Sequence, residues 1–404
     1  MNDFIKQLRP LLEGETLRKE LTVLPEVKAS FSSKAERLIA LLDIYKIYIP
    51  NEATIDVYTR LYLAVLNSLE RKDTYDEIVI LNDNFKVIKG LKHYGIIGGL
   101  ESFSITGQAG IGKSSTLERC AEIIVEGKTI VKKSPYREVI PILIVESPAD
   151  GSFKNLLFSI LQSIDAILGT DYLASNKHQT TTIDVLLSAT SNVLINHVGL
   201  LIIDEVERVA NESKKGTTLI NYLTQLVNQA NISIGFVGNV SANNYFQSKE
   251  YLARRTVGIK LEKMSYGEEY LGFLKTIFRY QYVPKQVVLS SEISREIYRL
   301  TNGIPSLIIA LFVETQRSII LESKESISVE ALRKTFVDQL MNVDLFLSST
   351  KVATPVVKKE EENDVLPEIS RHKEKAFETA RSIAGKDANK AISYLIEKIE
   401  IDII

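Results

Sequence analysis

The glycine-rich segment GQAGIGKSS, residues 107–115, constrains the fold of this chain more than any other part of its sequence. A short run rich in β-forming residues, 102–106, precedes it, and a helical pattern begins near Lys113. A turn of the form G-x-x-x-x-G-K-S between a strand and a helix is typical of loops that bind phosphate groups. Its glycines leave room for a phosphate chain, and the N–H groups at the start of the helix point at that chain. The segment therefore predicts an α/β domain that binds a nucleotide.

The residues of this loop have expected roles toward ATP or ADP. The ammonium group of Lys113 is expected to reach the β- and γ-phosphates, and the hydroxyl of Ser114 to ligate Mg²⁺. The residues expected to bind nucleotide are Gly107, Gln108, Ala109, Gly110, Ile111, Gly112, Lys113, Ser114, Ser115 and Asp204. The alternative is a glycine-rich turn that binds nothing, and the correct strand and helix on its two sides disfavour that alternative.

A second motif, GLLIIDE at residues 199–205, supplies the acidic groups that such a loop requires. Its apolar residues predict a buried parallel strand whose carboxyl end faces the ligand. Asp204 is expected to hold Mg²⁺ together with Ser114, and Glu205 to orient and deprotonate the attacking water. A nucleotide kinase or a pure binding module needs no second acid at this place. The motif therefore favours hydrolysis of ATP to ADP and phosphate.

Two later features suggest further catalytic residues. Asn239 follows the apolar run 232–238 and is positioned to sense the γ-phosphate and the water, although a turn-forming asparagine is the alternative. Arg254 and Arg255 precede a predicted strand at 257–261. They form either a surface pair or the arginine finger that a neighbouring subunit inserts at the γ-phosphate.

The pattern along the 404 residues divides the chain into five parts. These are an N-terminal helical region at 1–85, an α/β ATPase core at 86–265, a helical lid at 266–347, a linker at 348–370 and an amphipathic helical tail at 371–404. The tail either captures a partner or packs back on the core. Within the core, the charges of residues 128–137 predict a solvated loop.

Charge and cysteine content limit the partners and the compartment. The net charge of −2, from 49 basic and 51 acidic residues, gives no attraction of the whole molecule to nucleic acid, so DNA binding requires a local patch. A single cysteine, Cys120, excludes an internal disulfide and is expected to be a core residue. Apolar runs such as 139–145 are far shorter than the ~20 residues of a membrane helix. We expect a cytoplasmic protein that does not associate with membranes.

The motifs together resemble TnsC, the regulatory AAA+ ATPase of heteromeric cut-and-paste transposons. The resemblance covers about residues 24–340 and rests on the order of GQAGIGKSS, ESPADGSFKNLLFSILQSIDAILGT, GLLIIDEVERV, GFVGN, YLARRTVGIKLEKM and TNGIPSLIIALFVETQ. It implies a P-loop fold with a doubly wound parallel sheet and a C-terminal helical lid. It also implies an ATP-dependent homo-oligomer, a helical filament or ring, on duplex DNA. Such an oligomer would link a target-selector protein to the transposase subunits and release DNA as ATP is hydrolysed.

The resemblance further implies where DNA is bound. The turn after the second strand and the helix that follows it would face the duplex, which corresponds here to Lys154 in DGSFKN and to Thr181 or Thr182 in HQTTTID. A lysine near a helix start and nearby hydroxyls can contact phosphate oxygens without reading bases. An exposed lysine and a loop of threonines without DNA is the alternative.

Two departures from the resembled family stand out. Glu207 occupies a position where the family often has glutamine, and this change is expected to have little effect. Many AAA+ lids place a second-sensor arginine at the start of the helix where this chain has Pro305, Ser306 and Leu307, so no such arginine is assigned.

Other classes of nucleotide-binding protein stay open or are disfavoured. A signalling or defence switch that assembles without DNA, or a helicase or clamp loader, would share the nucleotide motifs. A GTPase is disfavoured because no N-K-x-D string occurs, and an ABC ATPase because L-S-G-G-Q is missing.

Overall fold

The computed structural model describes residues 4–72, 102–133, 136–177, 181–210, 216–230, 232–240, 242 and 256–340. The chain divides into two compact units, residues 1–352 and 353–404, and all described residues belong to the first. Several sequence predictions lie outside the described residues, namely Arg254, Arg255, the linker at 348–370, the tail at 371–404 and the boundary between residues 85 and 86.

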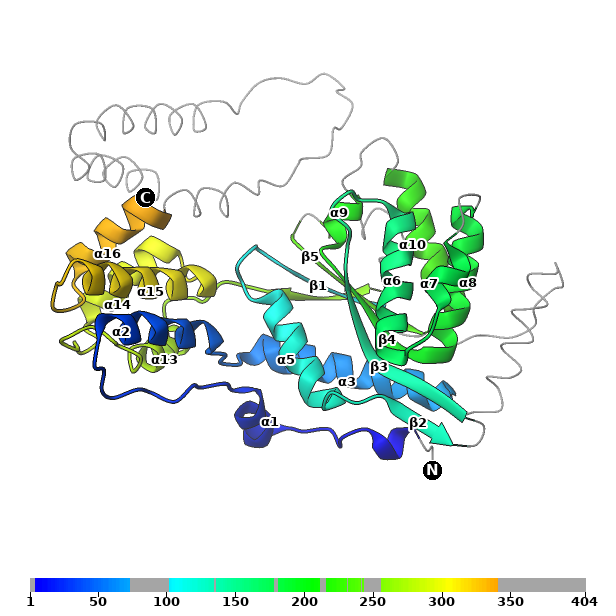
Figure 1. The fold of residues 1–404 in the computed structure, drawn as a ribbon, viewed down its shortest axis with the longest axis horizontal. Coiled ribbons are helices and arrows are strands. Elements are labelled where there is room, and N and C mark those ends of the chain that lie inside the picture. The colour runs from blue at the N-terminus through cyan, green and yellow to red at the C-terminus, as the bar shows by residue number, and fades with distance from the viewer. Residues whose placement is uncertain are drawn as a thin grey trace, which may run out of the picture. The chain divides into compact units, whose positions relative to one another are not determined.

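A six-stranded sheet forms the centre of the fold (Figure 1). Its strands are β1 (Ser102–Gly107), β2 (Ile130–Lys133), β3 (Tyr136–Glu146), β4 (Val198–Asp204), β5 (Ser233–Gly238) and β6 (Thr256–Leu261). They lie in the order β2-β3-β4-β5-β1-β6, and every neighbouring pair is parallel except β2 and β3. The predicted α/β fold with a doubly wound, mostly parallel sheet is thereby confirmed.

The β2 strand corrects one expectation. The charged segment 128–137, predicted as a solvated loop, contains β2 and the start of β3, paired antiparallel from Ile130 opposite Val139 to Lys133 opposite Tyr136. Ile130 is buried in the core, which is the apolar anchor that the run of charges obscured. Charge content alone was therefore a poor guide to this edge strand.

The central strands are buried on both faces. All residues of β1 and β4 are buried. The apolar run of β4 is continuous, whereas in β1 buried hydroxyl residues at 102, 104 and 106 alternate with Phe103 and Ile105. Along β4 the side chains alternate between two cores: Leu201 and Ile203 pack with one set of helices, and Leu200 and Ile202 with the other. Figure 1 shows α6, α8 and α10 on the first face and α3 and α5 on the second.

Side-chain caps fix where several core helices begin. The helices are α5 (Lys113–Val125), α6 (Phe153–Leu168), α7 (Tyr172–Asn176), α8 (Ile183–His197), α9 (Val206–Ala210) and α10 (Gly216–Ala230). Ser152 caps α6 and Thr182 caps α8, each accepting a hydrogen bond from the N–H group three residues later. The short helices α7 and α9 were not predicted from the sequence. Asp165 stabilises the start of α7 because its carboxylate accepts the N–H groups of Tyr172 and Leu173.

The helical lid has its own apolar core. It contains α13 (Glu268–Ile277), α14 (Ser291–Thr301), α15 (Pro305–Leu321) and α16 (Val329–Thr335), and α16 continues as a π-helical turn, Phe336–Leu340. The N-terminal helix α2 (Lys34–Ala40) and the 3-10 helix η2 (Leu41–Lys46) join the same core. The capping-box spacing of Ser33 and Glu36, followed by apolar residues at helical spacing up to Tyr45, predicts one helix that ends before Pro50. The structure has an α-helix capped by Ser33 that changes to a 3-10 helix at Leu41.

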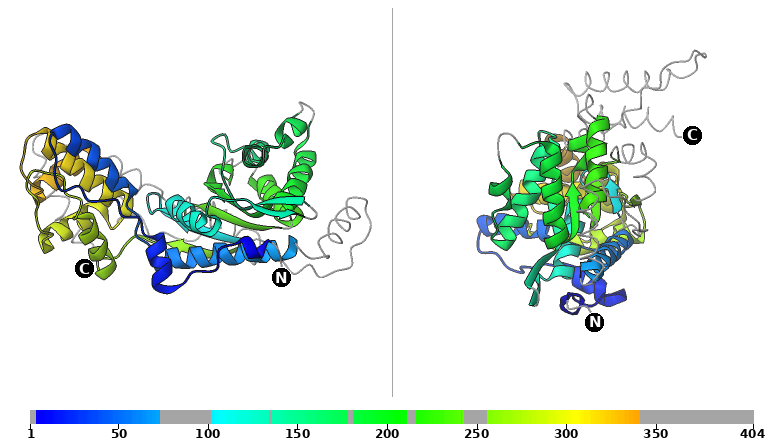
Figure 2. Two further views of the ribbon diagram at one scale, coloured as in Figure 1. Left: turned by 60° about the horizontal axis from the view of Figure 1, so that its bottom comes forward. Right: turned by 90° about the vertical axis from the view of Figure 1, so that its right-hand side faces the viewer.

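The remaining N-terminal elements lie along the ATPase core. They are η1 (Ile5–Gln7), α1 (Gly14–Leu21) and the long α3 (Glu52–Lys72), which Figure 2 shows running beneath the sheet. The side-chain amide of Gln7 bonds both the C=O and the N–H of Val131, at 2.8 and 3.1 Å, much as a neighbouring strand would. This contact covers part of the outer edge of β2.

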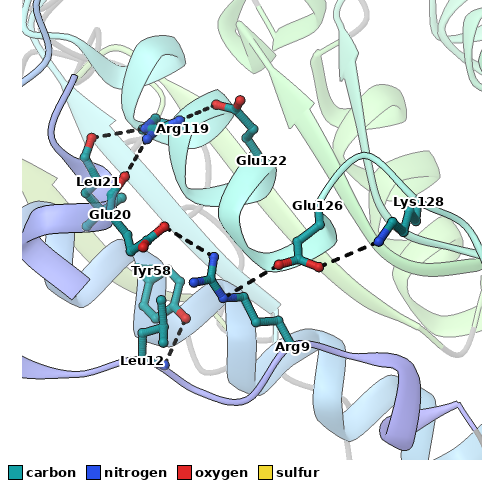
Figure 3. A network of polar contacts seen from close by, with 9 residues as sticks. All are labelled: Arg9, Leu12, Glu20, Leu21, Tyr58, Arg119, Glu122, Glu126 and Lys128. Carbon is teal, nitrogen blue, oxygen red and sulfur yellow. Dashed lines mark hydrogen bonds and ion pairs between the residues drawn. The ribbon is translucent and has the colours of Figure 1, made fainter. Parts of the chain in front are cut away.

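Residues 20–21, at the end of α1, are hydrogen-bonded to α5, the helix that follows the glycine-rich turn (Figure 3). Arg119 of α5 donates to the carbonyl oxygens of Leu21, at 3.0 Å, and Glu20. The chain then passes to the lid, where the hydroxyl of Tyr280 donates to the C=O of Pro25 at 2.8 Å. It returns at Tyr48, whose backbone exchanges two hydrogen bonds with that of Val23, at 2.9 and 3.0 Å. The N-terminal segment thus contacts both the core and the lid.

Among the described residues, no single helix has the length and apolar composition needed to cross a membrane. One helix pair, α14 with α15, meets those two criteria only when taken together and is bent by 119° at its junction.

Candidate active site

The turn between β1 and α5 places Lys113 at the mouth of a cavity. Gly112, immediately before the helix, has a φ of +96°, a left-handed conformation that favours glycine. The Lys113 ammonium group donates to the carbonyl oxygens of Gly107 and Gln108, at 2.9 and 3.2 Å. Burial lowers the pKa of Lys113, while the carboxylates of Glu207, Asp204 and Glu205 oppose that shift. The lysine therefore faces three acids across the site.

Ser114 and Asp204 meet although they are distant in sequence. The Ser114 hydroxyl donates to Oδ2 of Asp204 at 2.7 Å, and the Asp204 side chain is buried. A hydroxyl and a carboxylate are hard oxygen ligands of the kind that Mg²⁺ prefers. This pair fits a magnesium ion bound jointly with nucleotide phosphates.

Glu205 follows Asp204 in an uncommon backbone conformation. Its φ is +52°, which for a residue with a side chain costs about 1 kcal/mol, and its N–H donates to Oδ1 of Asp204 at 2.8 Å. Its carboxylate forms an ion pair with Arg208, which also bonds Oε1 of Glu146 at 2.6 Å. Burial raises the pKa of Glu205, the charge of Arg208 opposes this, and Glu146 adds to it. Arg208 therefore holds Glu205 beside the end of β3.

Asn239 lies at the tip of β5 and lines the same cavity. Its backbone N–H donates to Oε2 of Glu207 at 3.2 Å. Glu207, in the first turn of α9, also lines the cavity, although the sequence assigned it no function. The structure thus places Lys113, Ser114, Asp204, Glu205 and Asn239, to which the sequence analysis assigned roles, around one cavity, together with Glu207.

The cavity has a volume of about 1080 Å³ and extends beyond the glycine-rich turn. Its further wall contains Ile47, Tyr48 and Ile49 from the N-terminal segment and Met264, Pro305 and Ile309 from the lid. Tyr48 also donates its hydroxyl to Oγ1 of Thr116 on α5, at 3.0 Å. Sequence reasoning missed this wall because its residues lie far from the turn and carry no local motif.

The lid reaches the turn through the start of α15. The N–H of Ser306 donates to the carbonyl oxygen of Gly110 at 3.2 Å. A Cβ atom at Gly110 would overlap the Ser306 hydroxyl. The start of α15 therefore approaches the turn with the backbone and hydroxyl of Ser306 rather than with an arginine.

The proposed DNA-contacting residues form a separate group. The Lys154 ammonium group donates to the carbonyl oxygen of Thr181 at 2.8 Å and lies 5.8 Å from the centre of the Phe158 ring. Thr182 is exposed and uses its hydroxyl to cap α8. The structure thus places Lys154, Thr181 and Thr182 together, at the starts of α6 and α8.

Part of the chain is similar to a known protein family. Residues 87–266 match the family model described as Bacterial TniB protein, a transposition-associated AAA+ ATPase family. This match confirms the predicted resemblance at the level of such an ATPase. No curated protein sequence matches the chain.

Solved structures of initiator proteins are similar at low identity. The ORC2 protein of Aeropyrum pernix in its ADP form matches over 59% of this chain and 62% of its own, with 17% identity and a TM-score of 0.40. Drosophila ORC bound to DNA matches over 99% and 85%, with 9% identity and a TM-score of 0.47. Cdc6p from Pyrobaculum aerophilum matches over 63% and 65%, with 14% identity and a TM-score of 0.41. The chain spans less than two thirds of the archaeal ORC2 and Cdc6 chains.

Proposed function

We propose that this AAA+ ATPase, with its TniB-family core at residues 87–266, regulates DNA transposition by assembling on duplex DNA in the ATP state. In this proposal the assembly links a target-selector protein to the transposase subunits and comes apart as ATP is hydrolysed. The observation that carries the proposal is the family match, because the geometry of the site by itself suits many AAA+ proteins.

The site supports hydrolysis of ATP to ADP through its own side chains. Lys113 would bind the β- and γ-phosphates, and the N–H groups at the start of α5 would bind the phosphate chain. Ser114 and Asp204 would hold Mg²⁺, which neutralises phosphate charge when it is bound. Glu205 would take the proton from the attacking water, and Asn239 would orient that water against the γ-phosphate. Arg208 must release or share the carboxylate of Glu205 for this step.

The further wall of the cavity supports a place for the base. The side chains of Ile47, Ile49, Met264 and Ile309 are apolar, and the Tyr48 ring lies among them. Apolar side chains beside an aromatic ring suit a flat heterocycle. Because residues from the N-terminal segment and the lid share this wall, a bound nucleotide would contact both.

The group formed by Lys154, Thr181 and Thr182 supports contact with a DNA backbone. It combines one ammonium group with the starts of two long helices, which attract anions. One such group gives weak affinity, because few phosphates are neutralised per subunit. Repeating the group along a homo-oligomer, a filament or ring, would raise the affinity through multivalency.

Sedimentation of the protein with duplex DNA tests the proposal. Ordered assemblies should form on DNA with a non-hydrolysable ATP analogue and not with ADP, tolerate any sequence, and weaken steeply as salt increases. Lys154→Ala should reduce co-sedimentation about tenfold and leave nucleotide affinity unchanged. The matched control is Lys275→Ala, which removes an exposed lysine from the lid helix α13. Equal oligomers with and without DNA would instead favour the signalling or defence switch.

A further inference from the structure

Glu207 is a third carboxylate of the active site that the proposed chemistry does not use. It lies two residues after Glu205 and lines the cavity beside Lys113 and Asn239. Among the acids that oppose the lowering of the Lys113 pKa, Glu207 has the largest effect. Its Oε2 atom accepts the N–H of Asn239 at 3.2 Å. The side chain therefore bridges α9, which follows Glu205, and the tip of β5.

The residue before Asn239 leaves room for this contact. A Cβ atom built on Gly238 would lie 2.5 Å from Oε2 of Glu207, closer than Cβ atoms in proteins approach nonbonded neighbours. The same Cβ would lie 3.0 Å from Cβ of Ala242 and 3.1 Å from Cγ1 of Val206, distances that small shifts can accommodate. A side chain at position 238 would thus displace chiefly the Glu207 carboxylate. Glycine at position 238 therefore leaves the space that the carboxylate of Glu207 occupies.

We propose that Glu207 is a positioning residue for ATP hydrolysis. Its carboxylate fixes the tip of β5 against α9, so that Asn239 and Glu205 keep one spacing around the γ-phosphate and the attacking water. The inference rests on the proposed roles of Asn239 and Glu205. For hydrolysis it agrees with the expectation that glutamate and glutamine at this position differ little, because both offer an oxygen acceptor; it adds an effect of the charge on nucleotide binding.

The charge and the hydrogen bond of Glu207 have separable consequences. Its negative charge lies near the place of the triphosphate and disfavours nucleotide binding, so removing that charge should tighten binding. Its hydrogen bond positions Asn239, so removing the acceptor should slow the chemical step without weakening binding. A purely structural role would change neither parameter selectively.

Two substitutions at Glu207 separate these consequences. Glu207→Ala removes both charge and acceptor, and should lower kcat about tenfold while KM for ATP falls about threefold. Glu207→Gln keeps an oxygen that accepts the Asn239 N–H, and should retain most of kcat with the same lowered KM. Steady-state ATPase kinetics measures both parameters, and thermal unfolding checks that each variant is folded. Equal kcat for the alanine and glutamine variants would overturn the proposal.

Gly238→Ala tests the same contact from the other side. It should lower kcat about as much as Glu207→Ala, because its Cβ displaces the carboxylate. In the double variant the two losses should not add, since each removes the same hydrogen bond. Fully additive losses would contradict a shared contact.

Asn239→Ala distinguishes failure of the inference from failure of the proposed function. A slow Asn239→Ala with a normal Glu207→Ala would overturn only the role of Glu207. A normal rate for Asn239→Ala would remove the sensing role of Asn239, and with it the ground for this inference.

Discussion

Lys113 and Glu205, two residues of the active site, differ in the interactions of their side chains. Lys113 carries a charge that three carboxylates favour despite burial, so it is prepared to bind anionic phosphates. Glu205 has a strained backbone and an ion pair with Arg208, which together fix its carboxylate at the end of β4. The first residue is therefore suited to binding and the second to catalysis.

Replacing these two residues should separate binding from hydrolysis. Lys113→Ala should weaken ATP affinity by about 100-fold or more, because charge-assisted hydrogen bonds to the phosphates are lost. Glu205→Gln should keep the affinity and slow hydrolysis by about 10² to 10⁴, because the amide cannot accept the proton. Titration with a fluorescent ATP analogue and a phosphate-release assay measure the two effects. The control is Lys128→Ala, which removes an exposed lysine after α5 and should change neither ATP affinity nor the rate of hydrolysis. If Glu205→Gln hydrolysed ATP at the normal rate, Glu205 would not be the base.

At the scale of elements, one buried carboxylate ties two lid helices together. Glu296 of α14 bonds Arg333 of α16 at 2.9 and 3.1 Å, and Arg299 of its own helix at 2.6 and 3.2 Å. Burial alone would raise the pKa of Glu296, but the two arginines outweigh burial and lower it to about 2. The lid therefore depends on this side chain being ionised.

The stability of the lid should depend on pH through Glu296. Because the pKa of Glu296 is lower in the folded protein, its contribution is present above pH ~4.5 and is lost as the pH falls toward 2. Allowing for the half-exposed arginines, the contribution is about 2 to 3 kcal/mol. Urea denaturation should show that Glu296→Gln lowers the free energy of unfolding by this amount at pH 7 and by roughly 40% of it at pH 3. Glu330→Gln, an exposed glutamate on α16, is the control. If the loss of stability caused by Glu296→Gln did not change with pH, the role of the ionised Glu296 carboxylate would be contradicted.

Local signals account for the elements that the sequence predicted well. The strands β4 and β5 are mainly apolar runs, and β1 is a run of β-forming residues. The turn before α5 has a defined spacing of glycines, and Ser33 caps α2 as predicted. The elements that were missed depend on contacts with another element. β2 is stabilised by its pairing with β3, and α7 by the carboxylate of Asp165 on the preceding helix.

The residues of the active site likewise divide into those that local motifs predicted and those that depend on contacts with another element. Lys113, Ser114, Asp204 and Glu205 belong to two short motifs, and parallel strands bring such motifs to one edge of a sheet. The roles of Tyr48, Glu207 and Arg208 could not be predicted, because each depends on a partner in another element. No periodicity or spacing in one sequence reports such pairings.

At the scale of the whole molecule, the N-terminal segment connects the two parts that border the nucleotide cavity. It bonds Arg119 of α5 on one side and Tyr280 of the lid on the other, and the Val23–Tyr48 bridge lies between. A nucleotide that contacts Tyr48 and Pro305 would therefore influence how core and lid are held. Such coupling is what ATP-dependent assembly requires.

Assembly should also complete the active site. Arg254 and Arg255 are proposed to act on the γ-phosphate of a neighbouring subunit, and such a finger contributes about 10³ to 10⁵ in rate. The double alanine variant should bind ATP yet fail to hydrolyse it. Mixing this variant with Lys113→Ala should restore part of the activity, because one protein supplies the pocket and the other the arginines. Phosphate release from the mixture measures the rescue; absence of rescue, with normal oligomers of each variant, would argue against a shared site.

The N-terminal segment and the lid share one apolar core, so the chain can finish folding only after the lid has been synthesised. The hydrogen bond from Tyr280 to Pro25 joins residues 255 positions apart, and that from Lys34 to Ser323 joins residues 289 apart. A ribosome that adds about 5 to 20 residues per second needs roughly 15 to 60 seconds to synthesise the second partner after the first. During that time Ala40, Leu41 and Ile44 lack the lid helices that bury them. The nascent chain thus exposes an apolar surface for chaperones to bind before the lid is complete.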